Sequence, residues 1–243
     1  MTAILHKIGV IGAYFTNGYH NTTSGSLSEE YAREYSWPQR LAKLCGITAL
    51  HFGHAGWNCK KWLNSSLYTA VAETENKCTA YVVSFASNDI YEEDNPDRDY
   101  QLGTISDVNI GNESQNAASY YGYLSKIIAR LYEVQPKAYV FLQTYPYNYG
   151  RTETLGYSQA MRDIVAAYRN ENYRIYLIDY STYGMTIAEA QSKNMYRGSH
   201  YVASGYQYMA YELCTYIDWI IRSNMADFED AAFVGTNAEY IEE

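Results

Sequence analysis

The residues of this chain that could take part in chemistry lie in four short segments. One segment holds an asparagine, Asn88, and another holds a histidine, His200. Histidine can accept and return a proton near neutral pH, and an asparagine amide can stabilise an oxygen on which negative charge develops. The segments are IGAYFTNG (residues 11–18), GHAGWN (53–58), FASND (85–89) and GSHYVASGYQYMA (198–210). The first three each begin where an apolar run ends.

Five apolar runs must position these segments, because each has the length and composition of a buried strand. The runs cover residues 7–11, 48–52, 80–85, 138–143 and 174–178. The helical patterns cover residues 60–75, 114–133, 155–168 and 205–221. A further helix begins at Ser36, a suitable N-cap before Pro38, and ends at Gly46. The alternation predicts a three-layer α/β/α sandwich around a five-stranded, mostly parallel sheet, with ligands bound beyond the carboxyl ends of the strands.

The chain of 243 residues suits a single domain, since 4 prolines and 16 glycines leave no linker-like stretch. We expect residues 1–223 to form this domain. Residues 224–243 have an acidic composition and are expected to form a solvated tail, although Phe228, Phe233 and Val234 could dock on the domain.

In order and separation, the four segments resemble the sequence blocks of the SGNH/GDSL hydrolase family, and the resemblance extends over roughly residues 7–221. The last block is the most specific, because its histidine is followed by Gly-Tyr and Met-Ala leading into a final helix. The resemblance implies a flavodoxin-like α/β/α fold. It also implies hydrolysis of an ester or amide by a serine nucleophile, a histidine base, an aspartate that orients the base, and an oxyanion hole.

Carried over residue by residue, the resemblance is incomplete. His200 matches the base, and Gly56 and Asn88 match two elements of the oxyanion hole. Tyr14 stands at the position of the serine, and Arg197 stands at the position of the orienting aspartate. The resemblance therefore implies a degenerate site, which lacks the nucleophile needed for the covalent step.

Neighbouring positions have changed as well. Ala13 replaces the aspartate before the serine, and Ala86 replaces the glycine two residues before the asparagine. An arginine at position 197 would also disfavour an imidazolium beside it, whereas an aspartate would favour it.

Other side chains could replace the missing groups. Ser87, Thr16, Ser24 and Ser26 carry hydroxyls near the first and third segments, although a loop or capping role suits each of them better. Asp179 follows the fifth strand and could approach the histidine, but a capping role at the strand end is favoured.

The rim of the expected cleft is rich in acidic and aromatic residues. Residues 91–112 follow the third segment and form either a lid or a solvated acidic loop. Tyr145, Tyr147 and Tyr149 follow the fourth strand and form either a platform for sugar rings or a protein, or a half-buried extension of the strand. The predicted binding side chains are Tyr145, Tyr147, Ser87, Asp89 and Trp57.

Charge and composition limit the classes of partner. The formal net charge is -9 and no Lys/Arg cluster occurs, which argues against nucleic acid and against an anionic membrane surface. No apolar run is long enough to span a bilayer, and the first residues lack the features of a signal peptide. The expected location is the cytoplasm by default, or alternatively a virion.

We expect neither a metal nor another cofactor. His51 and His54 lack a nearby carboxylate motif, and the cysteines lack CxxC spacing. Four cysteines in a domain of this size are expected to be reduced and mostly buried; they are Cys45, Cys59, Cys78 and Cys214.

Three functional hypotheses follow. The first is a non-catalytic binding or structural protein, whose partner is a glycan, an acetylated carbohydrate, an assembly protein or a second copy of the chain, for example in a phage particle or surface assembly. The second is a divergent esterase or carbohydrate deacetylase that uses His200, Asn88 and Gly56 with another nucleophile. The third is a working enzyme inactivated only at Tyr14, in which serine at this position would restore activity.

Overall fold

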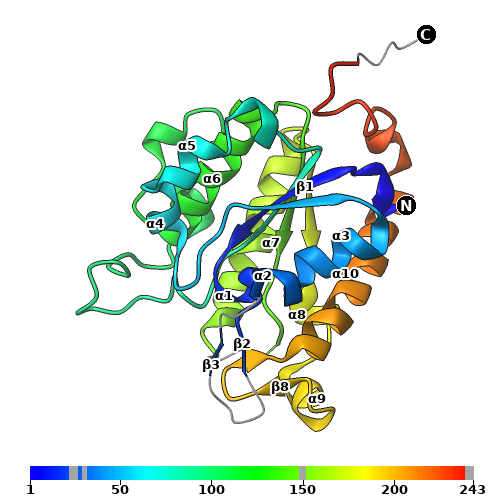
Figure 1. The fold of residues 1–243 in the computed structure, drawn as a ribbon. Coiled ribbons are helices and arrows are strands. Elements are labelled where there is room, and N and C mark those ends of the chain that lie inside the picture. The colour runs from blue at the N-terminus through cyan, green and yellow to red at the C-terminus, as the bar shows by residue number, and fades with distance from the viewer. Residues whose placement is uncertain (22–26, 29–31, 148–151, 239–243) are drawn as a thin grey trace.

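The computed structural model describes residues 1–21, 27–28, 32–147 and 152–238. Its centre is a five-stranded sheet with the order β4-β1-β5-β6-β7, in which all neighbouring strands are parallel (Figure 1). The strands are β1 (Lys7–Gly12), β4 (Thr48–His51), β5 (Ala80–Ser84), β6 (Tyr139–Gln143) and β7 (Ile175–Ile178). The five predicted strands are confirmed, with each end within one residue of the observed end.

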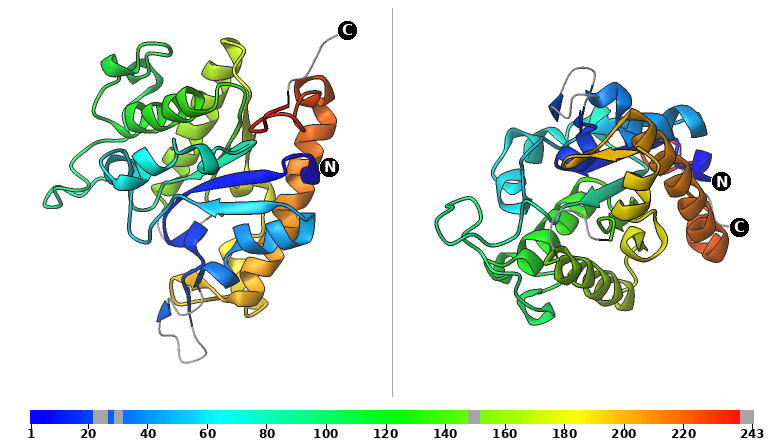
Figure 2. Two further views of the ribbon diagram at one scale, coloured as in Figure 1. Left: turned by 45° about the horizontal axis from the view of Figure 1, so that its top comes forward. Right: turned by 90° about the horizontal axis from the view of Figure 1, so that it is seen from below.

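Helices cover both faces of the sheet and complete three layers, which confirms the predicted α/β/α sandwich (Figures 1 and 2). On one face α3 packs against α10, and on the other α4, α6 and α7 pack in succession. The longer helices are α3 (Trp37–Cys45), α6 (Tyr120–Val134), α7 (Thr154–Asn170) and α10 (Ala203–Ser223). The shorter helices are α1 (Tyr14–Asn17), α2 (Ala32–Tyr35), α4 (Cys59–Leu63), α5 (Ser66–Ala70), α8 (Tyr180–Tyr183) and α9 (Ile187–Ser192).

Two small antiparallel pairs, which the sequence did not predict, lie beside the carboxyl ends of the main strands. One pair joins β2 (His20–Asn21) to β3 (Leu27–Ser28), and the other joins β8 (Tyr196–Arg197) to β9 (His200–Tyr201). Single turns of 3₁₀ helix complete the secondary structure: η1 (Thr2–Ile4), η2 (Thr74–Asn76), η3 (Ile105–Asp107), η4 (Glu113–Gln115) and η5 (Met225–Phe228).

The signals that begin and end α3 act as predicted. The Ser36 hydroxyl accepts a hydrogen bond from the Gln39 N–H, and Pro38 lies in the first turn. Gly46 follows the helix with a φ of 68°, a left-handed conformation that glycine adopts without steric cost.

Two predicted helices have different bounds in the structure. The helix expected over residues 60–75 is divided into α4 and α5, because the Ser65 hydroxyl accepts the Leu67 N–H and starts a new helix. The helix expected over residues 114–133 begins only at Tyr120, where the Ser119 hydroxyl accepts the Gly122 N–H. Serine side chains compete for backbone hydrogen bonds and so favour helix ends over helix interiors.

The segment after α10 packs on the domain as far as Val234, which differs from the expectation of a solvated tail. The Phe228 ring stacks on Tyr139 with centroids 4.3 Å apart, and both Phe228 and Val234 are buried. Arg174 pairs with Asp230 at 2.7 Å. These contacts hold the segment against the amino ends of β6 and β7. The last acidic residues, 239–243, lie outside the described residues.

Replacing Phe228 with leucine is expected to lower the free energy of unfolding by about 1 kcal/mol, because the ring stack is lost while most of the buried area remains. Phe233→Leu is the matched control, since Phe233 is 36% exposed. Its effect should stay within about 0.5 kcal/mol. Urea unfolding of both variants measures the difference, and equal effects would contradict docking through Phe228.

Candidate functional site

Three residues that the sequence analysis selected meet beyond the carboxyl end of β1. The ring of Tyr14 lies edge-on to the ring of His200, with centroids 5.2 Å apart. A β-carbon placed on Gly56 would lie 3.4 Å from the Tyr14 hydroxyl oxygen. The phenol of Tyr14 therefore fills the space between the histidine and the glycine.

The short helix α1 holds Tyr14 in this position. The Thr16 hydroxyl donates to the Ala13 carbonyl at 2.9 Å, and Thr16 is fully buried. Gly18 ends the helix with a φ of 78°, and a β-carbon there would lie 2.1 Å from the Ala32 carbonyl oxygen. Since its hydroxyl is bonded to the backbone within α1 and shielded from solvent, Thr16 has a structural role rather than that of a nucleophile.

Hydrogen bonds tie the loop of Asn88 to the loop of Gly56. The Asn88 side-chain amide donates to the Trp57 carbonyl at 3.1 Å, and the Asn58 amide donates to the Asn88 carbonyl at 3.3 Å. Arg98 donates to the Asn88 side-chain oxygen at 3.4 Å. One N–H of the Asn88 amide is thus already used by the protein, and both ends of the amide are held in place.

Asp89 lies beneath this loop and does not reach the surface, which differs from its predicted role in binding. Its Oδ1 accepts the Cys59 N–H at 2.8 Å and the Tyr100 hydroxyl at 2.7 Å, while Oδ2 is buried and has no hydrogen-bond partner among the described residues. Burial raises the pKa of Asp89 to about 6. Asp89 therefore positions the loop that carries Asn88.

Tyr145 was also predicted to bind ligand, but it is 1% exposed and packs on Phe15 with ring centroids 5.1 Å apart. Its hydroxyl interacts with the Ser87 side chain, so Ser87 is engaged as well. Tyr147 is 44% exposed. Tyr145 lies two residues after β6, and Thr144 between them is also buried, so the burial of that strand continues through Tyr145.

The remaining predicted rim residues include Trp57, which is half-buried and stacks on His54 at 5.0 Å. The segment expected to be a lid or a solvated loop is pinned to α4, because Lys60 pairs with Asp99 and Lys61 pairs with Asp97. Three residues of the earlier predictions lie outside the described residues: Ser24, Ser26 and Tyr149.

His200 lies in the β8–β9 pair, directly opposite Arg197. Its Nδ1 is 2.8 Å from the Ser199 hydroxyl, the one side-chain hydrogen bond that the described residues make to it. Burial lowers the pKa of His200 to about 4, so burial rather than repulsion by Arg197 keeps the ring neutral. Asp179 does not take the place of the missing aspartate, since it pairs with Arg162 at 2.7 Å.

We expect the His200 ring protons to titrate with a midpoint near pH 4 in NMR spectra, with His200→Gln identifying the resonance. Because the folded-state pKa lies below the usual 6.5, the neutral ring contributes stability that is present above pH 6.5 and is lost as the pH falls toward 4. A midpoint at or above 6.5 would instead indicate a carboxylate beside the ring.

The sequence analysis missed Ser199, although it precedes His200 directly. The turn of Gly198 and Ser199 joins β8 to β9, and Gly198 has a φ of 55°. This tight turn brings the serine hydroxyl back onto the imidazole. A Gly-Ser pair between two short aromatic runs is a hairpin signal that could have indicated the contact.

Among the residues that the structure describes, no group of three or more His, Cys, Asp or Glu side chains could hold a metal ion. In the same residues no helix has both the length and the apolar character needed to cross a membrane.

No protein-family model and no curated protein matches the chain. Solved structures do resemble it. A family 3 carbohydrate esterase from Clostridium thermocellum has a TM-score of 0.58 and 16% identity, over 89% of this chain and 97% of that chain. A lipolytic protein of the G-D-S-L family from Desulfitobacterium hafniense has a TM-score of 0.53 and 18% identity, over 87% and 99%.

A family two carbohydrate esterase from Clostridium thermocellum, solved with cellohexaose, has a TM-score of 0.60 and 14% identity. The match covers 91% of this chain and 65% of that chain. Together with the sheet order and the positions of Tyr14, Gly56, Asn88 and His200, these similarities show that the chain has the SGNH hydrolase fold.

Proposed function

We propose that this chain is a carbohydrate-binding protein built on the SGNH hydrolase fold, with a site that no longer hydrolyses esters through a serine. The observation that carries the proposal is the placement of Tyr14. Its phenol occupies the space between His200 and Gly56, where the family's serine and the substrate carbonyl would meet. A phenol cannot reproduce the reach of a serine hydroxyl, and the covalent step is lost with the serine.

The surroundings of His200 also differ from those of the histidine base in a serine hydrolase. His200 has a neutral hydroxyl, that of Ser199, in place of a carboxylate, and its pKa of about 4 lies far below neutral pH. A general base works best when its pKa is near the operating pH, and a carboxylate stabilises the imidazolium that forms. Two aromatic side chains remain on loops after the strands: Trp57, which is half-buried beside Gly56, and Tyr147, which is exposed on the segment after β6.

The support for carbohydrate as the ligand is the kind of protein that shares the fold. Two of the similar structures are carbohydrate esterases, and one was solved with cellohexaose. Aromatic side chains with polar tips suit sugar rings, whose C–H faces are apolar while their hydroxyls seek hydrogen bonds.

The test has two parts. The purified protein and its His200→Ala variant should both hydrolyse p-nitrophenyl acetate at the rate of buffer alone. In addition, the parent should bind oligosaccharides, with cellohexaose as the first probe, in isothermal titration calorimetry. Turnover by the parent that His200→Ala abolishes would overturn the non-catalytic part, and absence of oligosaccharide binding would overturn the binding part.

The second candidate function is a divergent esterase or carbohydrate deacetylase, and the Ser199–His200 contact favours it. The Ser199 hydroxyl is exposed and lies 2.8 Å from a ring nitrogen, as a serine nucleophile and its base would. This candidate predicts that Ser199→Ala and His200→Ala each abolish turnover of small acetyl esters. Equal rates in the parent and both variants would exclude it.

A further inference from the structure

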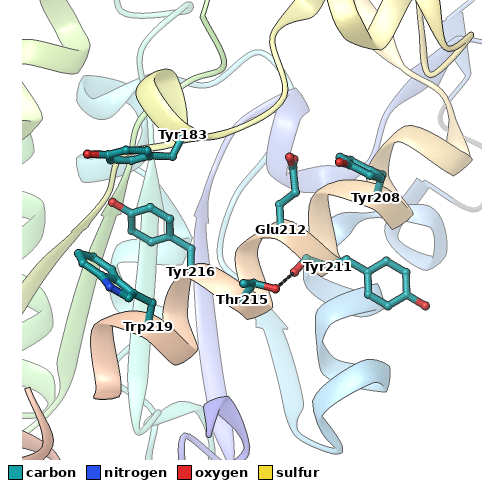
Figure 3. Close-up of a pocket in the computed structure, with 7 residues that line it drawn as sticks. All are labelled: Tyr183, Tyr208, Tyr211, Glu212, Thr215, Tyr216 and Trp219. Carbon is teal, nitrogen blue, oxygen red and sulfur yellow. Dashed lines mark hydrogen bonds between the residues drawn. The ribbon is translucent and has the colours of Figure 1, made fainter. Parts of the chain in front are cut away.

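The outer face of α10 carries a row of aromatic side chains that the site around Tyr14 does not use (Figure 3). The inner face of the helix is buried through residues such as Leu213 and Ile217. The row on the outer face repeats at intervals of three and four residues, which places its members on one side of a helix. The row includes two polar residues, Glu212 and Thr215, and its aromatic members on α10 are Tyr208, Tyr211, Tyr216 and Trp219.

Together with Tyr183 of α8, this row lines an open cavity of about 640 Å³, here named the α10 groove. Tyr183 is 70% exposed, Trp219 is 59% exposed and Tyr211 is 52% exposed. The Tyr216 ring lies between two of the others, 5.8 Å from Tyr183 and 5.4 Å from Trp219. Aromatic side chains gathered in one exposed patch indicate a binding surface.

Glu212 supplies a fixed hydrogen-bond acceptor in this groove. Its Oε2 accepts the Tyr180 hydroxyl and, at 3.4 Å, the Met185 N–H. Its Oε1 makes no hydrogen bond with any residue that the structure describes. The two hydrogen bonds to Oε2 restrict the rotation of the Glu212 side chain. A ligand that binds Oε1 therefore costs little additional side-chain entropy.

The lining selects the chemistry of the ligand. It consists of tyrosine, tryptophan, threonine and one carboxylate, without an aliphatic or cationic side chain. An anionic ligand would meet the Glu212 carboxylate and a chain of net charge -9. A neutral sugar would place its apolar C–H faces on the rings and donate hydroxyls to the carboxylate.

The shape of the row favours an extended ligand. Between Tyr208 and Trp219 it follows a straight helix for about 16 Å, at a rise of roughly 1.5 Å per residue. Tyr183, Tyr216 and Trp219 form one group of rings, and Tyr208 and Tyr211 lie further along the helix (Figure 3). Chains of β-1,4-linked six-membered sugars are extended ribbons with apolar faces, so a single chain could contact rings at both ends of the groove.

We propose that the α10 groove binds a neutral β-1,4-linked oligosaccharide, with the aromatic rings stacking on its sugars and Glu212 Oε1 accepting hydroxyl hydrogens. The inference rests on the proposed carbohydrate-binding function and gives it a second location. The groove shares no residue with the site of Tyr14, Gly56 and His200, so each can be removed without altering the other.

Calorimetric titration with cellohexaose and xylohexaose tests the inference. The parent should bind at least one of them, and the double variant Tyr183→Ala/Trp219→Ala should bind at least about tenfold more weakly. Glu212→Gln should also weaken binding. Phe233→Ala is the control, because Phe233 is an exposed aromatic residue, 36% exposed, that lies outside both the groove and the site of Tyr14, and this variant should bind like the parent. Circular dichroism confirms that each variant folds.

The outcomes separate the two proposals. Binding that the groove variants leave unchanged would overturn the α10 groove while the carbohydrate-binding function stands. A parent that hydrolyses esters but loses sugar binding in the groove variants would overturn the non-catalytic function while the groove stands. No binding of either sugar overturns both. Analytical ultracentrifugation tests whether a second copy of the chain occupies the groove. A dimer of the parent that sugar does not dissociate and that Trp219→Ala makes monomeric would assign the groove to a second copy. This result would overturn the inference.

Discussion

Replacing Asp89 with asparagine is expected to raise the free energy of unfolding at pH 7 by roughly 3 kcal/mol. Burial raises the pKa of Asp89 from 3.8 to about 6, so the folded protein holds a carboxylate at neutral pH in surroundings that favour the protonated form. An asparagine oxygen can still accept from the Cys59 N–H and the Tyr100 hydroxyl, as Oδ1 does now. The amide nitrogen would take the place of Oδ2, which accepts no hydrogen bond from any residue that the structure describes.

This gain should vanish in acid. A raised folded-state pKa gives a contribution to stability that is fully present below pH 3.8 and is lost as the pH rises through about 6. Asp89→Asn removes that dependence, so the parent and the variant should be about equally stable at pH 4 and differ most above pH 6.

Urea unfolding of both proteins at each pH gives the difference directly. The comparison cancels the opposite effect of His51 and His200, whose pKa values burial lowers to about 4 and which destabilise the fold as the pH falls from 6.5. A variant less stable than the parent at pH 7 would mean that the charge of Asp89 stabilises the loop of Asn88.

Restoring two of the missing groups should create esterase activity. The double variant Tyr14→Ser/Arg197→Asp is expected to hydrolyse p-nitrophenyl acetate at least about 100-fold faster than the parent, because it recovers both the nucleophile and the carboxylate expected to orient His200. Removing the phenol also opens the space between His200 and Gly56 for the substrate carbonyl.

The single variants are the controls. Groups that act as a unit have strongly non-additive effects, so each single variant should gain far less than the double variant. Activity in Tyr14→Ser alone would support the hypothesis of one inactivating change. A double variant at the parent's rate would show that Asn88, whose amide already donates to Trp57, is no longer placed to stabilise an oxyanion.

The sheet could be predicted from the sequence because each strand is an apolar run with both faces buried. In β5, for example, every residue from Ala80 to Ser84 is buried. The juxtaposition of Tyr14, Gly56 and His200 could also be predicted, since it depends on strand order and on the resemblance of the loops. Neither inference needs the position of a particular side chain.

Features that depend on tertiary contacts could not be predicted. The strands β8 and β9 have two residues each and no periodicity to detect, so the Gly198-Ser199 turn is the only sequence signal for the contact of Ser199 with His200. Local composition likewise did not reveal that Tyr145 and Asp89 are buried, because both residue types usually occur at surfaces. The outer row of α10, by contrast, has a helical period that is visible in the sequence.

The docking of the segment after α10 determines which side of the molecule faces a surface or fusion partner that is joined to the chain. Thr79, just before β5, donates to the Val234 carbonyl, and the Met1 amine lies 2.8 Å from Asp218 of α10. Both ends of the described chain therefore lie near the amino ends of the strands, away from α1 and the β8–β9 pair, which carry Tyr14 and His200 (Figure 1). A sensor chip or fusion partner joined beyond the docked segment would leave Tyr14 and His200 facing away from it, so protein immobilised in this way should keep the ligand-binding capacity of that site. Attachment through the Met1 amine, by contrast, would come close to Trp219 of the α10 groove, because Asp218 precedes Trp219 directly.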